Sequence, residues 1–347
     1  MAYTTINKSS QHFTNKVYTG NGSARNITGL GFQPDFTIVK RKDNSGVWYN
    51  TDIVRGAGKQ MYLNETGAMG GSVSTSEITG FNSDGFNLGT DGGVNASGGT
   101  YTSFNFFANN TTGSSNTDGD VTSTVSVNTT AGFSIVKWDS TGTAGINIGH
   151  GLGQKPAMII AKCLNQSSTS WPVYHQSLGA TKYVSLQGTT AETTSATRWN
   201  NSEPTTTTFQ TGSSGDIGGS NRTMIAYCFA EKTGYSKFGS YEGNNNADGT
   251  FIYTGFKPRF IHMKDVDQAA SPVWIDMTNN SFTNPHKGRL YTDGNSAIGS
   301  SVVMDGLSNG FKLRTTLGNC NSASTFIYMA FAEAPLVGTN GVTAKAR

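Results

Sequence analysis

The sequence repeats itself three times, and this repeat constrains the fold more than any other feature. Each copy contains a proline followed six positions later by a lysine, at Pro34 and Lys40, Pro156 and Lys162, and Pro258 and Lys264. A tryptophan follows 14, 15 and 16 residues after the respective prolines, at Trp48, Trp171 and Trp274. Each copy closes on an aromatic run whose last aromatic lies 73 residues after its proline, at Phe107, Phe229 and Phe331. Such regular spacing predicts three homologous domains in tandem.

Within each copy the residue pattern favours strands separated by turns. The proline cannot donate to a strand ladder, so it suits a strand entrance. The segment 36–40 that follows is β-branched and aromatic, as strands prefer. Asp84-Gly85, between two apolar runs, indicates a tight hairpin. Seven or eight short strands in about 100 residues predict an all-β chain of three tandem β-sandwich or jelly-roll domains.

The predicted domains span 1–110, 120–232 and 235–335, followed by an extended tail at 336–347. The polar segment 109–130 is expected to be a linker, part of which, 121–127, alternates like an edge strand. We expect each domain to bury a core of its own around its tryptophan and closing aromatics. A single chain of this kind would be a flexible string of thin units.

Composition and charge argue against several classes of partner. The net charge is only +3, without any run of Lys or Arg, so nucleic-acid binding is not expected. No apolar run approaches the roughly 18 residues of a membrane helix, so no membrane insertion is expected. The start of the chain lacks a charged segment followed by an apolar one, which predicts synthesis in the cytoplasm without a signal peptide.

The residues that usually carry chemistry form no recognisable constellation. The five histidines occupy different repeat positions, and the cysteines, Cys163, Cys228 and Cys320, fit neither a metal site nor a disulfide framework. Carboxylate pairs for glycoside hydrolysis are the strongest enzymatic alternative, with candidates that include Asp52 and Asp276, but none recurs in all three copies. We therefore predict no catalytic residue, no cofactor and no metal, and a protein that is not an enzyme.

Two further features bear on surfaces. Lys40, Lys162 and Lys264 are predicted to face solvent from strand edges, where lysine discourages strand pairing. The Gly-, Ser-, Thr- and Asn-rich loops 89–100 and 187–221 are the expected recognition surfaces, because short polar side chains hydrogen-bond adaptably.

Several segments together resemble a known family. They are the opening 1–8, residues 18–22 and 31–35, Val54-Arg-Gly-Ala57, the hairpin 81–86 and the ending 329–336. The chain resembles virion proteins of tailed bacteriophages, especially phages of aquatic bacteria. This family consists of structural or tail-fibre-like proteins with lectin-like, concanavalin A-like β-sandwich repeats, and the resemblance transfers no catalytic residue.

The resemblance implies a non-enzymatic structural protein on the exterior of the virion. A tail fibre or tail-associated protein for adhesion to the host surface is the first expectation. A capsid decoration or head-fibre protein is the alternative, and a glycan depolymerase is a third. The implied partners are other virion proteins, further copies of the chain in a homo-oligomer for which a trimer is expected, and a glycan or protein of the host surface.

Overall fold

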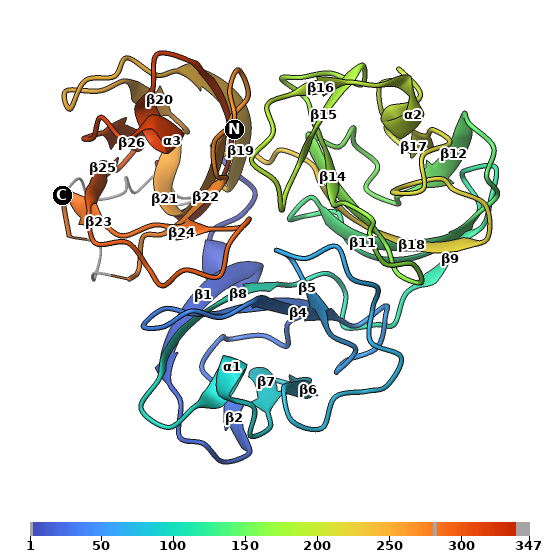
Figure 1. The fold of residues 1–347 in the computed structure, drawn as a ribbon, viewed down its shortest axis with the longest axis horizontal. Coiled ribbons are helices and arrows are strands. Elements are labelled where there is room, and N and C mark those ends of the chain that lie inside the picture. Colours follow the sequence, from blue (N-terminus) through green and yellow to red (C-terminus); the bar gives the residue numbers. More distant parts are fainter. Residues whose placement is uncertain (1–2, 280–282, 338–347) are drawn as a thin grey trace.

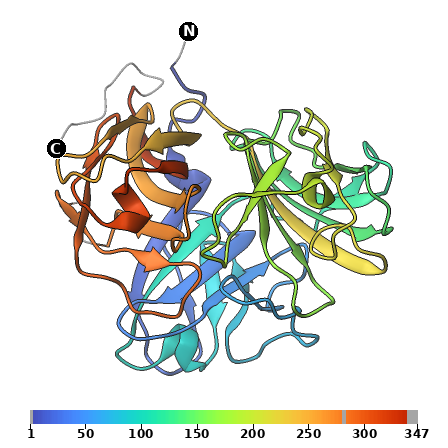
Figure 2. The ribbon, with the colours of Figure 1, turned by 45° about the horizontal axis from the view of Figure 1, so that its top comes forward.

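The computed structural model describes residues 3–279 and 283–337. Its described residues are almost entirely β-strand, with antiparallel pairing throughout the named strands, so the all-β prediction is confirmed. Three lobes surround a common centre, and they pack against one another in both ribbon views (Figures 1 and 2). Of the predicted tail 336–347, residues 338–347 lie outside the described residues.

Lobe 1 pairs an inner sheet, in the order β1-β8-β3-β4-β5, with a small outer sheet, in the order β2-β7-β6. The hairpin predicted at Asp84-Gly85 joins the last two outer strands, where Asn82 pairs with Gly85. Its elements are η1 (Ser9–Gln11), β1 (Phe13–Thr19), β2 (Arg25–Ile27), β3 (Phe36–Arg41), β4 (Trp48–Asp52), β5 (Met61–Tyr62), β6 (Ile78–Asn82), β7 (Gly85–Leu88), α1 (Gly92–Asn95) and β8 (Thr100–Phe106).

Lobe 2 has the longest sheet, in the order β16-β15-β14-β13-β18-β11-β10-β9, and an outer pair, β12-β17. The strand expected within 121–127 is β10, which pairs with β11. The elements are β9 (Ser114–Asn116), β10 (Ser123–Asn128), β11 (Phe133–Ser140), β12 (Ile146–Gly149), β13 (Met158–Cys163), β14 (Pro172–His175), β15 (Lys182–Ser185), β16 (Thr193–Thr194), α2 (Ala196–Trp199), β17 (Thr208–Thr211) and β18 (Arg222–Phe229).

Lobe 3 repeats the inner order of lobe 1, as β19-β27-β21-β22-β24, and has an outer sheet in the order β20-β26-β25-β23. Its elements are β19 (Ser236–Glu242), β20 (Phe251–Tyr253), β21 (Phe256–Asp265), β22 (Val273–Asp276), β23 (His286–Lys287), β24 (Leu290–Tyr291), β25 (Val302–Leu307), β26 (Gly310–Leu313), α3 (Gly318–Asn321) and β27 (Thr325–Pro335). The closing strands β8, β18 and β27 take the same place in the three inner sheets, between β1 and β3, between β11 and β13, and between β19 and β21.

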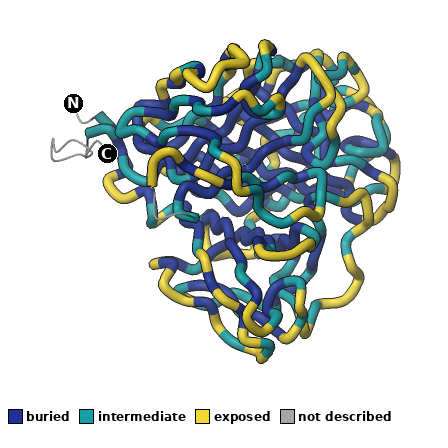
Figure 3. Tube along the Cα trace, turned by 60° about the vertical axis from the view of Figure 1, so that its left-hand side comes forward, coloured by how far each residue is buried: buried dark blue, intermediate teal, exposed yellow. Residues whose placement is uncertain are grey.

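The inner sheets of all three lobes share one hydrophobic core. A single buried cluster takes residues from lobes 1, 2 and 3, whereas the space between the inner and outer sheet of each lobe holds a separate cluster. Figure 3 shows buried backbone running through the body, with exposed segments on its outside. The expectation of a flexible string is therefore wrong, because aromatic mass assigned to three separate cores instead joins the lobes.

Six phenylalanines form the centre of this shared core. The closing-strand residues Phe106, Phe229 and Phe331 contact one another pairwise, with ring centroids 5.5 to 6.0 Å apart. Strands β1, β11 and β19 add Phe13, Phe133 and Phe238, each of which contacts the closing phenylalanine of its own lobe and that of one neighbour. Such tilted and edge-to-face rings contribute beyond the area they bury. The centre thus repeats three times around an axis within one chain.

The equivalent residue in the first copy is Phe106, not the predicted Phe107. Phe36 pairs with Phe106, just as Met158 pairs with Phe229 and Phe260 with Phe331. Phe107 follows the end of β8 and packs away from the centre, against Phe32 and His12. Side chains alternate between faces along a strand, so an error of one residue moves the predicted contact to the opposite face.

Candidate functional site at the outer face of lobe 3

The three repeat prolines lie two residues before equivalent strand residues, but only two of them precede the strand itself. Pro34 and Pro156 are buried two residues before β3 and β13 begin. Pro258 lies inside β21, with register shifts on both sides of it. A bulge accommodates a residue that has no N–H to donate. The prediction of an equivalent strand entrance is therefore wrong for Pro258, because the long β27 extends the ladder past it.

The repeat tryptophans all belong to the shared core, but their registers differ. Trp48 pairs with Lys40, six residues after its proline, whereas Trp274 pairs with His262, four residues after its proline. A shift of two keeps the same face of the sheet. Trp48 Nε1 donates to a carbonyl of lobe 3 and Trp171 Nε1 to one of lobe 1, at 2.8 and 3.0 Å. Trp274 Nε1 lacks a partner among the described residues.

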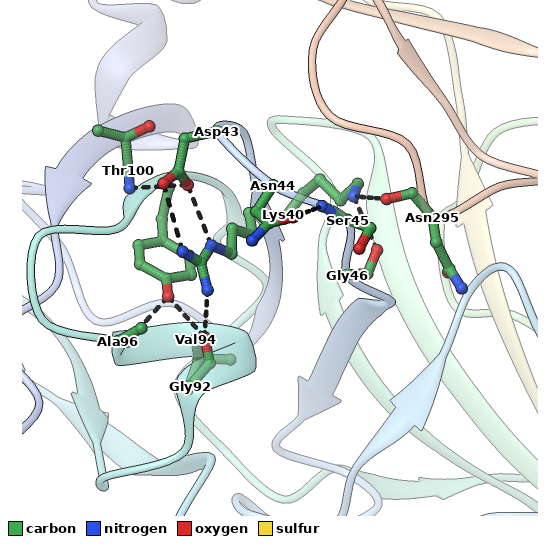
Figure 4. Close-up of polar contacts among 12 residues, drawn as sticks. Lys40, Asp43, Asn44, Ser45, Gly46, Gly92, Val94, Ala96, Thr100 and Asn295 are labelled. Atoms are coloured by element: carbon green, nitrogen blue, oxygen red, sulfur yellow. Dashed lines mark hydrogen bonds and ion pairs between the residues drawn. The ribbon is translucent and has the colours of Figure 1, made fainter.

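The repeat lysines are buried at the lobe interfaces, which corrects the prediction that they face solvent. Lys40, Lys162 and Lys264 are 0 to 1 % exposed. Each ammonium donates to a carbonyl in its own following turn and to a carbonyl of the neighbouring lobe (Figure 4 shows Lys40). The acceptor pairs are Gly46 and Asn295 for Lys40, Thr169 and Thr66 for Lys162, and Ala270 and Thr189 for Lys264, at 2.5 to 3.2 Å.

The same backbone contact recurs beside each lysine. The carbonyl of the neighbouring lobe that binds the lysine also accepts a hydrogen bond from a backbone N–H in the lobe of the lysine. Three residues after that carbonyl, a backbone N–H of the neighbouring lobe donates to a carbonyl in the lobe of the lysine. These bonds join Gly46 to Asn295 and Ile298 to Lys42, Thr169 to Thr66 and Met69 to Leu164, and Ala270 to Thr189 and Glu192 to Val266. Burial lowers the pKa of each of the three lysines to about 8. These residues build interfaces, and their geometry explains why their spacing repeats.

A second polar position also serves the interfaces. Asp52, His175 and Asp276 lie opposite Phe36, Met158 and Phe260 at the ends of equivalent strands. Tyr227 of lobe 2 donates to Asp52 at 2.7 Å, His175 contacts the Tyr328 carbonyl of lobe 3 at 3.1 Å, and Thr102 of lobe 1 donates to Asp276 at 2.5 Å. Asp52 also forms a fully buried ion pair with Arg55. The structure therefore places both carboxylates in structural contacts between lobes.

The loops expected to be recognition surfaces are partly committed to packing. Val94 of loop 89–100 and Trp199 of loop 187–221 are buried in the separate cores of their lobes. In the second loop the carbonyl of Thr189 binds Lys264 of lobe 3. Only the remaining parts of these loops face solvent.

The outer sheets differ where they face solvent. Ile27, Ile148 and Ile252 are equivalent buried residues, since they pair with Phe86, Phe209 and Phe311. The residues on either side of each isoleucine lie on the opposite face of the strand. In lobe 1 they are the exposed Asn26 and Thr28. In lobe 2 they are Asn147 and the buried Gly149, which the segment 116–120 covers. In lobe 3 they are Phe251 and Tyr253. Phe251 is 43 % exposed and Tyr253 is 54 % exposed, on a three-residue edge strand.

Charged side chains and a surface hollow adjoin this aromatic pair. Lys312 pairs with Phe251 across the sheet and binds the largely exposed Asp248 at 2.9 Å. On the other side, the Tyr3 hydroxyl donates to the Gly255 carbonyl at 2.7 Å. Burial, together with a hydrogen bond to Tyr253, raises the pKa of Tyr3 to about 12.

Tyr3 also lines a hollow of about 350 Å³ between the N-terminal segment, lobe 2 and the connection from lobe 2 to lobe 3. Its other lining residues are polar: Thr4, Thr5, Gln154, Glu231, Lys232 and Thr233. We call the surface from this hollow through Tyr3, Tyr253 and Phe251 to Lys312 and Asp248 the aromatic strip. Spacing from the prolines does not reveal the aromatic strip, because the equivalent Ile27, Ile148 and Ile252 lie seven, eight and six residues before their prolines.

His150, His175, His262 and all three cysteines are buried, and the charge of His175 also acts on His262. Burial lowers the pKa of His150 and His175 to about 4 and that of His262 to about 3, and it raises the pKa of Cys320 to about 12. All three cysteines are buried and free. In residues 3–279 and 283–337, no three His, Cys, Asp or Glu gather in a way that would hold a metal. No helix in those ranges is long and apolar enough to cross a membrane.

Comparison with known proteins identifies a family for nearly the whole chain. No curated protein and no solved structure matches it. A family described as a domain of unknown function, DUF7483, matches residues 8–335, which include the inner and outer sheets of all three lobes. The chain therefore belongs to the DUF7483 family.

Proposed function

We propose that this protein is a non-enzymatic structural protein on the exterior of a tailed-bacteriophage virion, where it contacts the host surface as a tail fibre or tail-associated protein. The resemblance of its opening, hairpin and closing segments to virion proteins supports the proposal. The aromatic strip supports host contact, because exposed apolar patches on a protein surface often mark binding sites.

The observation that carries the proposal is the shared core of the three lobes. The six central phenylalanines and the lysine interfaces hold the lobes in fixed relative positions. A protein that transmits contact from a particle to a surface needs such a rigid body. One chain supplies this rigidity without a partner copy, so the homo-oligomer that the resemblance implies stays a separate prediction.

A capsid decoration protein is the second candidate, and the same threefold arrangement favours it. Three equivalent interfaces surround one axis, so a single chain matches a threefold position on an assembly without needing two further copies. In that role its partners would be other virion subunits, and the aromatic strip would still face outward.

Immunogold electron microscopy of purified virions, with antibody raised against the purified protein, tests the proposal. We expect gold at the tail or its tip, together with peptides of the chain in the mass spectrum of the particles. Gold over the capsid would favour the decoration role instead. Particles that lack both gold and peptides would refute a virion protein of either kind.

A further inference from the structure

The outward side chains of lobe 3 differ in kind from those of lobes 1 and 2. Positions that point into the shared core repeat in all three lobes, as the phenylalanines and lysines show. Positions that flank the equivalent outer isoleucines do not repeat, and lobe 3 exposes Phe251 and Tyr253 there. Small polar residues are compatible with these positions, since Asn26 pairs in the outer sheet of lobe 1 and Thr28 follows the end of β2. Tyr253 contacts Tyr3 through a hydrogen bond, but the faces of both rings remain largely accessible to a ligand.

We propose that the aromatic strip binds a saccharide chain, an inference that rests on the proposed role in host contact. The CH faces of sugar rings stack on aromatic rings, and sugar hydroxyls need many hydrogen-bonding partners around that platform. Phe251 and Tyr253 lie two strand positions apart, about 6.6 Å along the strand, so they can contact successive parts of one chain. Tyrosine suits such contacts because its ring is amphipathic and stiff.

Polar groups flank the rings at both ends. At one end Lys312 and Arg314 share the exposed Asp248, at 2.9 and 3.1 Å. At the other end the hollow of about 350 Å³ presents Gln154, Glu231 and Lys232 beside Tyr3. Lys232 Nζ donates to Gln154 Oε1 at 3.0 Å, which orients the amide. Both ends therefore carry side chains of both charge signs, which suits a neutral or zwitterionic saccharide.

The same observations favour a saccharide over a protein that adds a strand. The edge strand β20 has three residues, which offers few backbone groups for strand addition. In lobe 2 the chain itself covers the equivalent edge, because Val121 bridges Ile148 and Asp120 N donates to the Asn147 carbonyl at 2.9 Å. In lobe 3 the exposed groups at this position are rings and charges, which recognise a saccharide better than they recognise a backbone.

The test exchanges the two rings for the residues of lobe 1. The variant Phe251→Asn with Tyr253→Thr should fold, because lobe 1 carries Asn26 and Thr28 at these positions. The matched control is Asn26→Ala with Thr28→Ala. Binding is measured for the full chain on a printed array of bacterial oligosaccharides and by calorimetry with polysaccharide released from the host surface.

We expect the wild-type chain to bind a subset of these saccharides and the lobe 3 variant to bind them about tenfold or more weakly, while the variant still unfolds in a single thermal transition like the wild type. The lobe 1 control should bind like the wild type. The inference is overturned if the wild type binds no saccharide, or if the lobe 3 variant binds as well as the wild type. It is also overturned if the variant retains saccharide binding but loses attachment to a virion protein. Virion labelling decides the proposed function independently of these results.

Discussion

Removing one ring from the centre of the shared core should weaken all three lobes together. Phe229 is 2 % exposed, and its ring contacts Phe106 of lobe 1 and Phe331 of lobe 3 at 5.7 and 6.0 Å between centroids. Phe229→Ala removes a side chain whose deletion from a core costs about 3 to 5 kcal/mol, of which a residual cavity of about 80 Å³ accounts for about 2 kcal/mol. We take about 4 kcal/mol as the expected loss.

The shift of the melting temperature then reports the size of the unit that unfolds. Unfolding entropy is about 2.1 cal/mol/K per residue, so a cooperative unit of about 335 residues shifts by about 6 °C and a lobe of about 110 residues by about 17 °C. The shared core predicts the smaller shift, in a single transition whose calorimetric and van't Hoff enthalpies agree.

Differential scanning calorimetry of wild type and variant measures this directly. Phe251→Ala is the control, because that ring is 43 % exposed, and it should move the midpoint by no more than about 1 °C. Several separate transitions, of which Phe229→Ala moves one by about 17 °C, would show that the lobes unfold independently and that the reasoning is wrong.

Three further predictions concern buried polar and reactive groups. Because burial lowers the pKa of His175 from 6.5 to about 4, the unfolded chain takes up a proton first, so stability should fall as the pH drops from 6.5 to 4, by about 3 kcal/mol for this residue. His175→Gln removes the group that takes up this proton. Its free energy of unfolding, measured with urea at pH 6.5 and at pH 4, should therefore fall by about 3 kcal/mol less than that of the wild type. Arg55→Met leaves the Asp52 carboxylate buried without its ion-pair partner and should cost about 3 to 5 kcal/mol, whereas an effect below about 1 kcal/mol in urea unfolding would contradict the buried pair. Cys163, Cys228 and Cys320 are buried, so iodoacetamide should label none of them in the native chain and all three after denaturation. Mass spectrometry counts the labels, and labelling of the native chain would contradict the prediction.

The strand content could be predicted from local signals, but the arrangement of the lobes could not. β-branched runs, prolines and the Asp84-Gly85 turn act over a few residues, so they indicate strands and the hairpin. The burial of Lys40 depends on the carbonyl of Asn295, which lies 255 positions away. The residues next to a strand lysine do not indicate whether its ammonium binds a distant carbonyl or water. Lysine usually lies at the protein surface, so the surface was the natural prediction.

The candidate site was predictable only by comparing copies. Spacing from the proline locates each copy, yet it placed Phe107 on the wrong face because the first copy is one residue out of step. The aromatic strip is recognised when Phe251 and Tyr253 are compared with Asn26 and Thr28 at equivalent positions. That equivalence is known only from the strand pairing in the outer sheets. The hollow beside Tyr3 combines the two ends of a long chain segment, 3–5 and 231–233, whose proximity no local pattern encodes.

Joining the three lobes in one chain also changes how the threefold body responds to dilution. A true trimer dissociates as its concentration falls, since association costs translational and rotational freedom each time it forms. Here the lobes are covalently linked, so each meets its neighbours at a high effective concentration that does not depend on how much protein is present. The body that contains the six central phenylalanines therefore stays assembled at any dilution, and its stability is a property of folding alone.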